Sequence, residues 1–263
     1  MRDYSFDSLL EIMKRLRREC PWDRVQTNDS IKGHTIEEAY EVVEAIDRRD
    51  DEALKAELGD LLLHVVFHAE IAEEEGRFTI GDVIRTLLEK LVRRHPHVFG
   101  DVEVDGADEV KRNWEQIKMD EGRDSVIDGV PSVLPALLKA YRVQDKASKV
   151  GFDWVRPEDV WDKVLEEIGE LRDSLGNPSL DPRRVEEEFG DLLFALVNYA
   201  RFIKVNPEDA LRRSIDKFSA RFRAVEKRYR DEGKNIHTAT LEELDRCWDE
   251  VKREENGGGM RHG

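Results

Sequence analysis

The sequence predicts an all-α protein built from two tandem helical-bundle repeats, and three observations support this fold class. A sparse pattern of carboxylates occurs twice: two adjacent glutamates, a third glutamate three residues on, and then a Glu-x-x-Asp pair. The residues around both copies are also similar, which indicates an internal repeat. Alternating β-branched runs bounded by turns, which are the signal of strands, are nearly absent.

The first repeat opens with an amphipathic, charged helix over residues 1–20. Two acid-bearing helices follow, the first with Glu37, Glu38 and Glu41 and the second with Glu57 and Asp60. The second acid-bearing helix continues into the most apolar stretch of the chain, residues 61–72. This pattern is expected for a buried helix that carries its acids at one end.

Each repeat continues with a helix that has a Lys-x-x-x-Arg face and closes with a helix that contains tryptophan. These features lie at Lys90 and Arg94, Lys217 and Arg221, Trp114 and Trp248. The linker is expected at residues 120–135, which are rich in glycine and proline. Pro207, followed by Glu208 and Asp209, favours the start of a helix. We therefore expect one repeat at 1–122, a second at 123–255 and a disordered tail at 256–263.

Composition excludes some classes of function. The 59 acidic and 43 basic residues give a net charge of −16, and nucleic-acid backbones require basic surfaces instead. The apolar stretch is far shorter than the ~20 residues of a membrane span. The amino terminus lacks a secretory apolar run, and only two cysteines are present, which suits a reducing compartment. We expect a cytoplasmic protein with neither nucleic acid nor membrane as a partner.

The two acid patterns predict metal sites. Residues three apart share a helix face, so two facing acid-bearing helices bring four carboxylates around one point, and such a cluster requires a cation. The expected ligands are Glu167, Glu170, Glu188 and Asp191 in the second repeat, with a possible second site at Glu38, Glu41, Glu57 and Asp60. Oxygen ligands favour Mg²⁺, with Mn²⁺ possible. A di-iron carboxylate bundle requires Glu-x-x-His on two of its helices. No histidine of this sequence has a glutamate three residues before it, so this class of metal site is excluded.

Other residue patterns bear on the substrate. The repeated Lys-x-x-x-Arg pairs suit contacts with phosphate, and Trp248 is equally suited to core packing and to stacking on a base. His64 and His68 are spaced like zinc ligands, but Ala195 and Tyr199 occupy the aligned positions, which favours a core or interface role. No Walker loop or dinucleotide-binding motif is present. Metal-activated water is the only nucleophile that these patterns support.

Several motifs resemble the MazG family of tandem nucleoside triphosphate pyrophosphohydrolases. Those of the first half are CPWDRVQT at 20–27, IEEAYEVVEAI at 36–46, ELGDLLLHVVFHA at 57–69 and RRHPHVFGD at 93–101. Those of the second half are KVGFDW at 149–154, EEIGEL at 166–171, EEFGDLLFALVNYAR at 187–201 and KFSARF at 217–222. The resemblance covers residues 4–255, and the doubled acid pattern is typical of the all-α NTP pyrophosphohydrolase superfamily.

The resemblance implies Mg²⁺-dependent hydrolysis of nucleoside triphosphates to the monophosphate and pyrophosphate, with broad base tolerance, nucleotide-pool housekeeping and a homodimeric assembly. It assigns Mg²⁺ to the four second-repeat carboxylates and a catalytic role to Glu166 and Glu167. By the same resemblance, the nucleotide contacts are Lys163, Arg184, Glu187, Lys217, Arg221 and Trp248. The apolar runs at 61–72 and 192–200 also predict a homodimer, because they exceed what a small bundle needs to bury.

The first repeat departs from this pattern, with His34 in place of Lys163 and Ala53 in place of Arg184. Each lost charged hydrogen bond costs about 1.5–3 kcal/mol, so the second repeat is expected to be the main catalytic one. Two alternatives remain open. One is a narrower hydrolase for dUTP, dCTP, oxidised or signalling nucleotides, and the other is a non-catalytic, metal-stabilised helical module.

Overall fold

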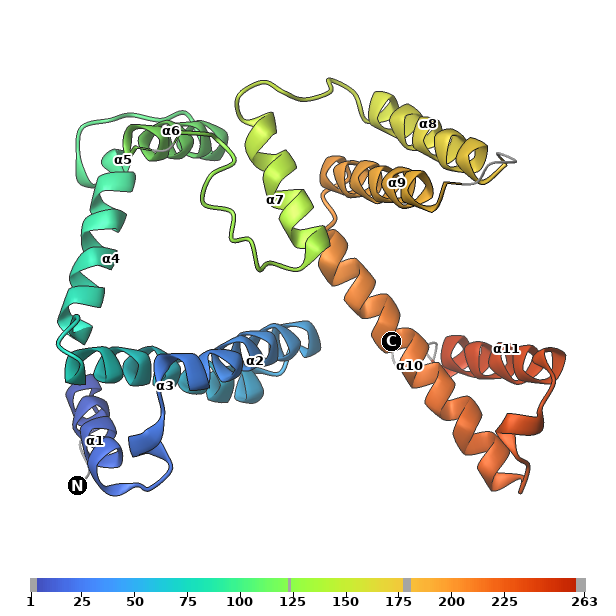
Figure 1. Ribbon diagram of the computed structural model, residues 1–263, viewed down its shortest axis with the longest axis horizontal. Coiled ribbons are helices and arrows are strands. Elements are labelled where there is room, and N and C mark those ends of the chain that lie inside the picture. The colour runs from blue at the N-terminus through green and yellow to red at the C-terminus, as the bar shows by residue number, and fades with distance from the viewer. Residues whose placement is uncertain (1–3, 123, 177–180, 259–263) are drawn as a thin grey trace. The chain divides into compact units, whose positions relative to one another are not determined.

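The computed structural model describes residues 4–122, 124–176 and 181–258, and Figure 1 shows the order of the helices. These residues form eleven α-helices and two 3-10 helices, with no strand among them, which confirms the all-α prediction. The chain divides into two compact units, Met1–Val110 and Lys111–Gly263. The division falls within α6 (Ala107–Asp120), before the expected boundary at residue 122. The expected domain limits stay a prediction.

The first unit is centred on a helical hairpin in which α2 and α3 pack along each other, while α1 and α4 also contact α3. Its elements before α6 are α1 (Phe6–Glu19), the 3-10 helix η1 (Asp23–Val25), α2 (Asn28–Arg48), α3 (Asp51–Glu74), α4 (Ile80–Arg94) and α5 (Pro96–Phe99). The core of the unit contains Met13, Ile31, Val66, Phe67 and Ile71. The hydrophobic residues of α1, α2 and α3 therefore meet on one side of the hairpin.

Local capping explains where the acid-bearing helices of the first unit begin and end. Thr27 and Ser30 form a capping box at the start of α2, which satisfies backbone N–H groups that have no partner inside the helix. Arg49 has a φ of 54° and ends α2 in the left-handed conformation. Asp50 then accepts a hydrogen bond from the backbone N–H of Ala53 at the start of α3. This tight turn returns α3 along α2.

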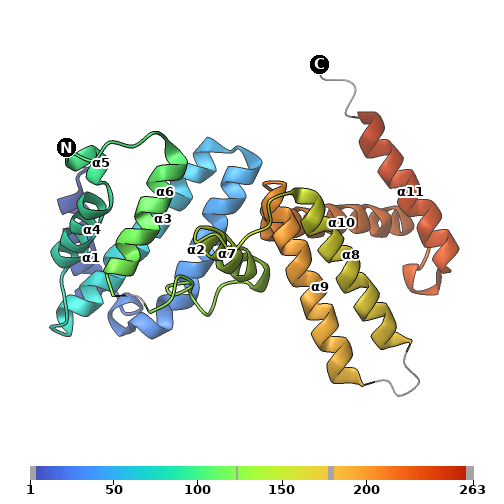
Figure 2. The same ribbon diagram turned by 90° about the horizontal axis from the view of Figure 1, so that it is seen from above.

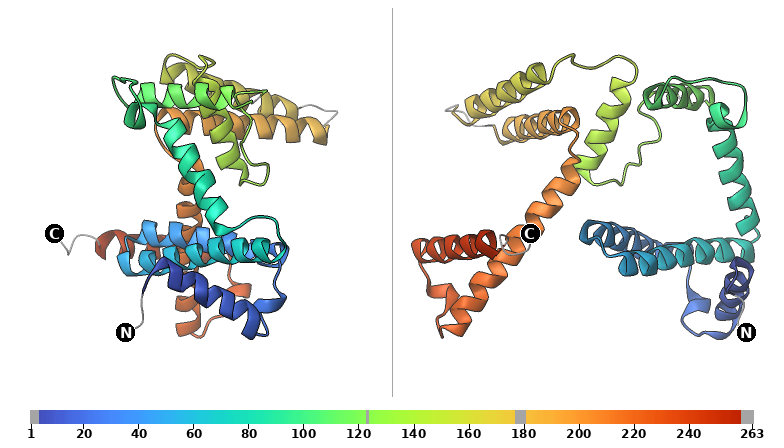
Figure 3. Two further views of the ribbon diagram at one scale, coloured as in Figure 1. Left: turned by 90° about the vertical axis from the view of Figure 1, so that its left-hand side faces the viewer. Right: turned by 180° about the vertical axis from the view of Figure 1, so that it is seen from behind.

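The second unit contains a similar hairpin of α8 and α9, which lie side by side in Figures 1 and 2, with α7 packed against α9. Its elements after α6 are α7 (Ala136–Ser148), α8 (Pro157–Leu175), α9 (Pro182–Phe202), α10 (Pro207–Asp231), the 3-10 helix η2 (Ile236–Thr238) and α11 (Leu241–Gly258). Figure 3 shows α11 turning back toward α10 after η2, and these two helices share a small core of their own.

Helix starts in the second unit follow the sequence signals. Pro207 occupies the first turn of α10, and the side chain of Asn206 accepts hydrogen bonds from the backbone N–H groups of Glu208 and Asp209, which confirms the predicted start.

Helix α11 extends to Gly258, into the segment for which we expected disorder, and residues 259–263 lie outside the described residues. Among the described residues, no helix combines the length and the apolar character that a bilayer span requires.

Candidate active site

The α8–α9 hairpin brings together three of the four carboxylates that the sequence predicts as metal ligands. Glu167 and Glu170 lie three residues apart on α8, and Glu188 lies near the start of α9. One carboxylate oxygen from each of these residues lies within 4.8 Å of the others. We call these three residues the second-repeat trio.

Burial and mutual repulsion of the carboxylates distinguish the second-repeat trio. Glu167 is only 5% exposed, and its Oε2 is buried without a hydrogen-bond partner. Burial, followed by the negative charges of Glu167 and Glu188, raises the pKa of Glu170 above its ordinary value. A buried acceptor without a partner is costly, and a divalent cation would satisfy it. The all-oxygen donor set fits Mg²⁺ or Mn²⁺.

Two of the expected cationic residues lie beside the second-repeat trio. Lys163 Nζ is 2.7 Å from Glu167 Oε1 and 2.8 Å from Glu166 Oε1, and hydrogen bonds to Glu166 and then to Glu167 raise the pKa of Lys163 far above its ordinary value. Arg184 Nε is 3.4 Å from Glu188 Oε1. Glu166 itself is exposed and lies outside the trio. One cationic side chain therefore lies next to Glu167 and another lies next to Glu188.

Asp191 and Glu187 are placed differently from the trio. Asp191 was expected as a fourth ligand, but the groups of carboxylates that approach within 4.8 Å among the described residues do not include it. It borders a cavity that Lys163 and Glu167 also line. Glu187 is exposed on α9 beside Glu188.

The remaining predicted nucleotide contacts gather on α10 and α11 instead of beside the trio. Arg221 Nε is 2.7 Å from Glu255 Oε2, and the Arg221 guanidinium lies 5.9 Å from the Trp248 ring centre. Phe218 also packs against Trp248, at 5.1 Å between ring centres, and Lys217 is exposed nearby on α10. In the described part of the chain, the principal helix contact of α11 is with α10. The roles of Lys217, Arg221 and Trp248 therefore stay predictions from the resemblance.

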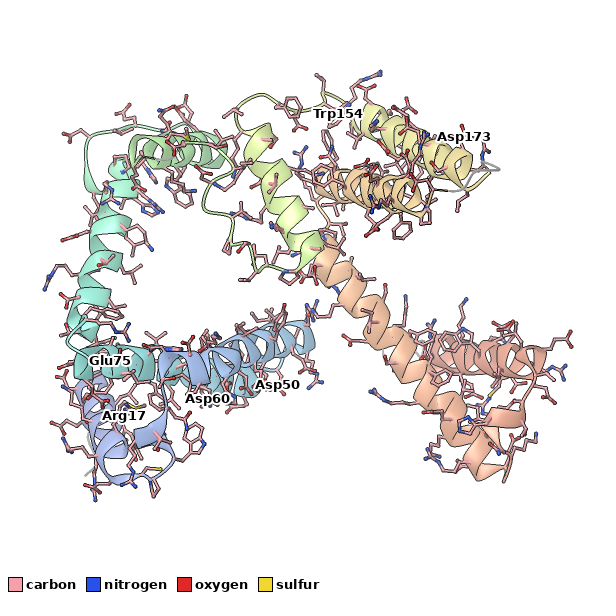
Figure 4. The ribbon with its side chains drawn as sticks, viewed as in Figure 1. Arg17, Asp50, Asp60, Glu75, Trp154 and Asp173 are labelled. Atoms are coloured by element: carbon pink, nitrogen blue, oxygen red, sulfur yellow. The ribbon has the colours of Figure 1, made fainter. Side chains whose placement is uncertain are left out.

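The first repeat contains an equivalent carboxylate cluster in a different setting. Oxygens of Glu38, Glu41 and Glu57 lie within 4.8 Å of one another, and burial, followed by the charge of Glu41, raises the pKa of Glu57. Asp60, which is labelled in Figure 4, is exposed on α3. It lies outside this trio, as Asp191 does in the second repeat. His64 Nε2 lies 3.8 Å from Glu38 Oε1.

The first repeat lacks the cations found beside the second-repeat trio. His34, at the position of Lys163, forms an exposed contact with Glu37 at 3.0 Å. His68 Nε2 lies 2.9 Å from Thr35 Oγ1, and its Nδ1 lies 2.8 Å from Asn28 Nδ2. These contacts join His68 on α3 to Asn28 and Thr35 on α2, and the core or interface role expected for this histidine stays a prediction.

Sequence reasoning missed one feature, a cavity of about 320 Å³ beside the second-repeat trio. Gln144, Phe152, Trp154 and Asn198 are among its lining residues. The available signal was Asn198, a polar residue within the apolar run of α9, because Phe67 occupies the aligned position in the first repeat.

Similarity to known proteins extends over both repeats. A profile of the MazG nucleotide pyrophosphohydrolase domain matches the chain twice, over residues 26–99 and 156–225. The nucleoside triphosphate pyrophosphohydrolase/pyrophosphatase MazG of Thermotoga maritima is 48% identical over 252 residues, which cover 94% of this chain and 95% of that protein. The nucleoside triphosphate pyrophosphohydrolase of Escherichia coli K12 is 45% identical over 256 residues, or 95% of this chain and 97% of that protein.

A third relative, the uncharacterised protein YabN of Bacillus subtilis, is 47% identical over 257 residues, which cover 96% of this chain and 52% of that protein. The profile matches include both carboxylate trios, and the similarity to the Thermotoga and Escherichia proteins extends over nearly the whole of each chain. On these grounds the chain belongs to the MazG nucleotide pyrophosphohydrolase family, whose domain it contains twice.

Proposed function

We propose that the second repeat hydrolyses nucleoside triphosphates to nucleoside monophosphate and pyrophosphate in the presence of Mg²⁺. The observation that carries this proposal is the second-repeat trio, in which the buried Glu167 Oε2 has no hydrogen-bond partner while Oε1 is held by Lys163. Curated relatives that are similar over nearly their whole length are named as nucleoside triphosphate pyrophosphohydrolases. The trio and its neighbouring cations suit a substrate that arrives as a metal–polyphosphate complex.

Each charged residue around the trio has a distinct role in this proposal. Glu167, Glu170 and Glu188 would hold Mg²⁺, with Asp191 in a supporting position at the neighbouring cavity. When bound, Mg²⁺ supplies charge neutralisation and Lewis acidity toward the phosphate oxygens. Lys163 and Arg184 stabilise the negative charge that develops on the phosphates.

Glu166 is the better-placed carboxylate to orient the attacking water. It is exposed and lies outside the trio, so metal binding does not consume its oxygens. Its hydrogen bond to Lys163 at 2.8 Å keeps it next to the phosphate-binding cation. Because a general base must reach the proton that it removes, this placement favours Glu166 over Glu167.

The test of this proposal is pyrophosphate release from a panel of NTPs and dNTPs that includes ATP, with Mg²⁺, with Mn²⁺ and with chelator. We expect turnover of several bases with either metal and none with chelator, as suits a housekeeping enzyme of the cytoplasmic nucleotide pool. Turnover of only one nucleotide would indicate a narrow substrate range in place of the broad base tolerance that we propose. No pyrophosphate from any nucleotide would contradict the proposal.

We also propose that the protein is a homodimer, formed through apolar stripes on the hairpins. Large hydrophobic side chains spaced three or four residues apart, and therefore on one helix face, are exposed on α8 and α9. They are Leu165, Ile168, Phe189, Leu193 and Leu196. The first repeat has a similar exposed set at Ile36, Tyr40, Leu58, Leu62 and Val65. A second copy of the chain would remove this apolar surface from water.

Light scattering at micromolar concentration tests the assembly. Leu193→Lys should shift the mass toward the monomer, because the substitution places a charge within the apolar stripe. Val155→Lys is the matched control, since Val155 is 93% exposed and lies outside α8 and α9. A monomeric wild-type protein would contradict the homodimer.

A further inference from the structure

Three histidines of the first repeat lie in a row beside its carboxylate trio. The ring centres of His34 and His64 are 6.3 Å apart, and those of His64 and His68 are 6.4 Å apart. His34 lies on α2, whereas His64 and His68 lie one helical turn apart on α3. The aligned residues of the second repeat are Lys163, Ala195 and Tyr199. The row of imidazoles therefore distinguishes the first repeat from the second.

His64 is buried, with one ring nitrogen unpartnered and the other directed at the trio. The residue is 9% exposed, and its Nδ1 is buried without a hydrogen-bond partner. Its Nε2 lies 3.8 Å from Glu38 Oε1, which is too long for a hydrogen bond. Two atoms that each bind one metal ion at about 2.1 Å lie at most about 4.2 Å apart. The separation of His64 and Glu38 is therefore one that a shared metal ion spans.

His34 has the hydrogen bond that is typical of a metal-binding histidine. Its Nδ1 lies 3.0 Å from Glu37 Oε2, which leaves Nε2 for a ligand. Metal-bound histidines usually pair the ring nitrogen that does not bind the metal with a carboxylate or a carbonyl, and this pairing fixes the direction of the ring. The side chain of His34 is 51% exposed, so the ring has room to turn toward Glu38, one helical turn further along α2.

His68 is not a further ligand, because both of its ring nitrogens are engaged. Nδ1 lies 2.8 Å from Asn28 Nδ2, and Nε2 lies 2.9 Å from Thr35 Oγ1. The oxygen of the Asn28 amide accepts a hydrogen bond from Arg77, so the amide N–H₂ faces His68 and can only donate. Nδ1 of His68 therefore accepts, and its Nε2 carries the proton. Three candidate ligands remain: His34, His64 and Glu38.

We propose that His34, His64 and Glu38 bind a first-row transition-metal ion, such as Zn²⁺, which joins α2 to α3. Oxygens of Glu41 and Glu57 lie within 4.8 Å of an oxygen of Glu38, and these residues supply further carboxylate ligands. Imidazole nitrogen suits Zn²⁺, Cu²⁺ and Ni²⁺, whereas Mg²⁺ prefers oxygen ligands.

The two repeats then select different metals, and the ion of the first repeat braces a hairpin. Its ligands come from both α2 and α3, so an ion bound there stabilises the folded first unit by mass action. In the second repeat, Lys163 occupies the position of His34 and pairs with Glu167 at 2.7 Å. A cation of the protein itself thus stands where the first repeat offers a nitrogen ligand. This inference does not depend on the proposed function, because it concerns the first repeat alone.

The experiment measures Zn²⁺ binding to the whole chain, without a polyhistidine tag, by calorimetry in saturating Mg²⁺. We expect a Zn²⁺ site that Mg²⁺ does not block, and a Zn²⁺-dependent rise in the Tm of the first unit. His34→Lys and His64→Ala each copy the aligned residue of the second repeat. Both should weaken Zn²⁺ binding on the order of a hundredfold, because loss of even an outer-shell partner costs about 10–100-fold.

Two controls locate the site. His237→Gln removes an exposed histidine of the second unit and should leave Zn²⁺ affinity unchanged. His68→Tyr copies Tyr199 and should also keep the site, since His68 is not a ligand in this proposal. If His64→Ala does not fold, the exposed His34→Lys still provides the test. The inference is overturned if the wild type binds no Zn²⁺ in Mg²⁺, if folded His34→Lys keeps wild-type affinity, or if His68→Tyr abolishes binding.

Discussion

A glutamine at position 167 provides a sharp test of the metal site. Glu167→Gln keeps the shape of the side chain, and the amide oxygen still accepts the hydrogen bond from Lys163 that Oε1 accepts at 2.7 Å. The substitution removes one negative charge and replaces the unpartnered buried Oε2 with an N–H₂ group that cannot bind a cation. Loss of metal binding is therefore expected without loss of the hairpin.

The size of the effect follows from mass action. A ligand that binds only the folded state at a hundred times its Kd adds about 2.7 kcal/mol to the free energy of unfolding. For a unit of the size of Lys111–Gly263, this corresponds to a rise in Tm of about 5–10 °C. The Tm of the wild-type protein should rise by this amount when the chelator is replaced by saturating Mg²⁺. In Glu167→Gln, the unfolding transition of the second unit should no longer show this rise in Tm.

The assay is thermal unfolding followed by circular dichroism at several Mg²⁺ concentrations. Glu166→Gln is the matched control, because Glu166 also binds Lys163 but lies outside the trio, and it should keep the full rise. Glu38→Gln separates any contribution of the first repeat. The reasoning fails if wild-type Tm is the same in chelator and in Mg²⁺, or if Glu167→Gln retains the wild-type rise.

Two further predictions concern pH and the asymmetry of the repeats. Because the pKa of Glu170 is raised in the folded state above 4.5, its contribution to stability is present below that value and is lost as pH rises through the raised pKa. In the presence of a chelator, Glu170→Gln should therefore flatten the fall of Tm as the pH rises above 4.5, and curves parallel to wild type would contradict this. Glu170→Ala and Asp191→Ala should reduce kcat/KM on the order of a hundredfold or more, whereas Glu41→Ala and Asp60→Ala should reduce it far less. Equal losses in folded variants, measured by pyrophosphate release, would refute the asymmetry.

Local signals predicted most of the helical architecture. Residues three apart on one helix share a face, so the Glu-x-x-Glu spacing alone placed Glu167 beside Glu170 and Glu38 beside Glu41. Helix starts such as Pro207 follow from backbone chemistry at the first turn, which involves only neighbouring residues. The repeat in the sequence likewise predicted two similar hairpins, because similar apolar patterns pack in similar ways.

The sequence did not predict which long-range neighbours each helix face would meet. Glu188 joins its trio whereas Asp191, three residues later on α9, borders the adjoining cavity. That distinction depends on how α8 and α9 cross, which is a property of packing and not of spacing. Arg221 and Trp248 are paired on α10 and α11, and motif comparison alone does not reveal that the two helices form their own core.

The amino-acid pattern alone determined an all-α chain with two repeats, two sets of acids and more cations in the second repeat. The tertiary structure decided that these acids converge as trios, and that a cavity lies beside the trio of the second repeat. The physical reason is side-chain volume in a close-packed interior. Ala147 and Asn198 leave space between α7 and α9. At the aligned positions of the first repeat, Arg17 and Phe67 are larger and pack against each other between α1 and α3.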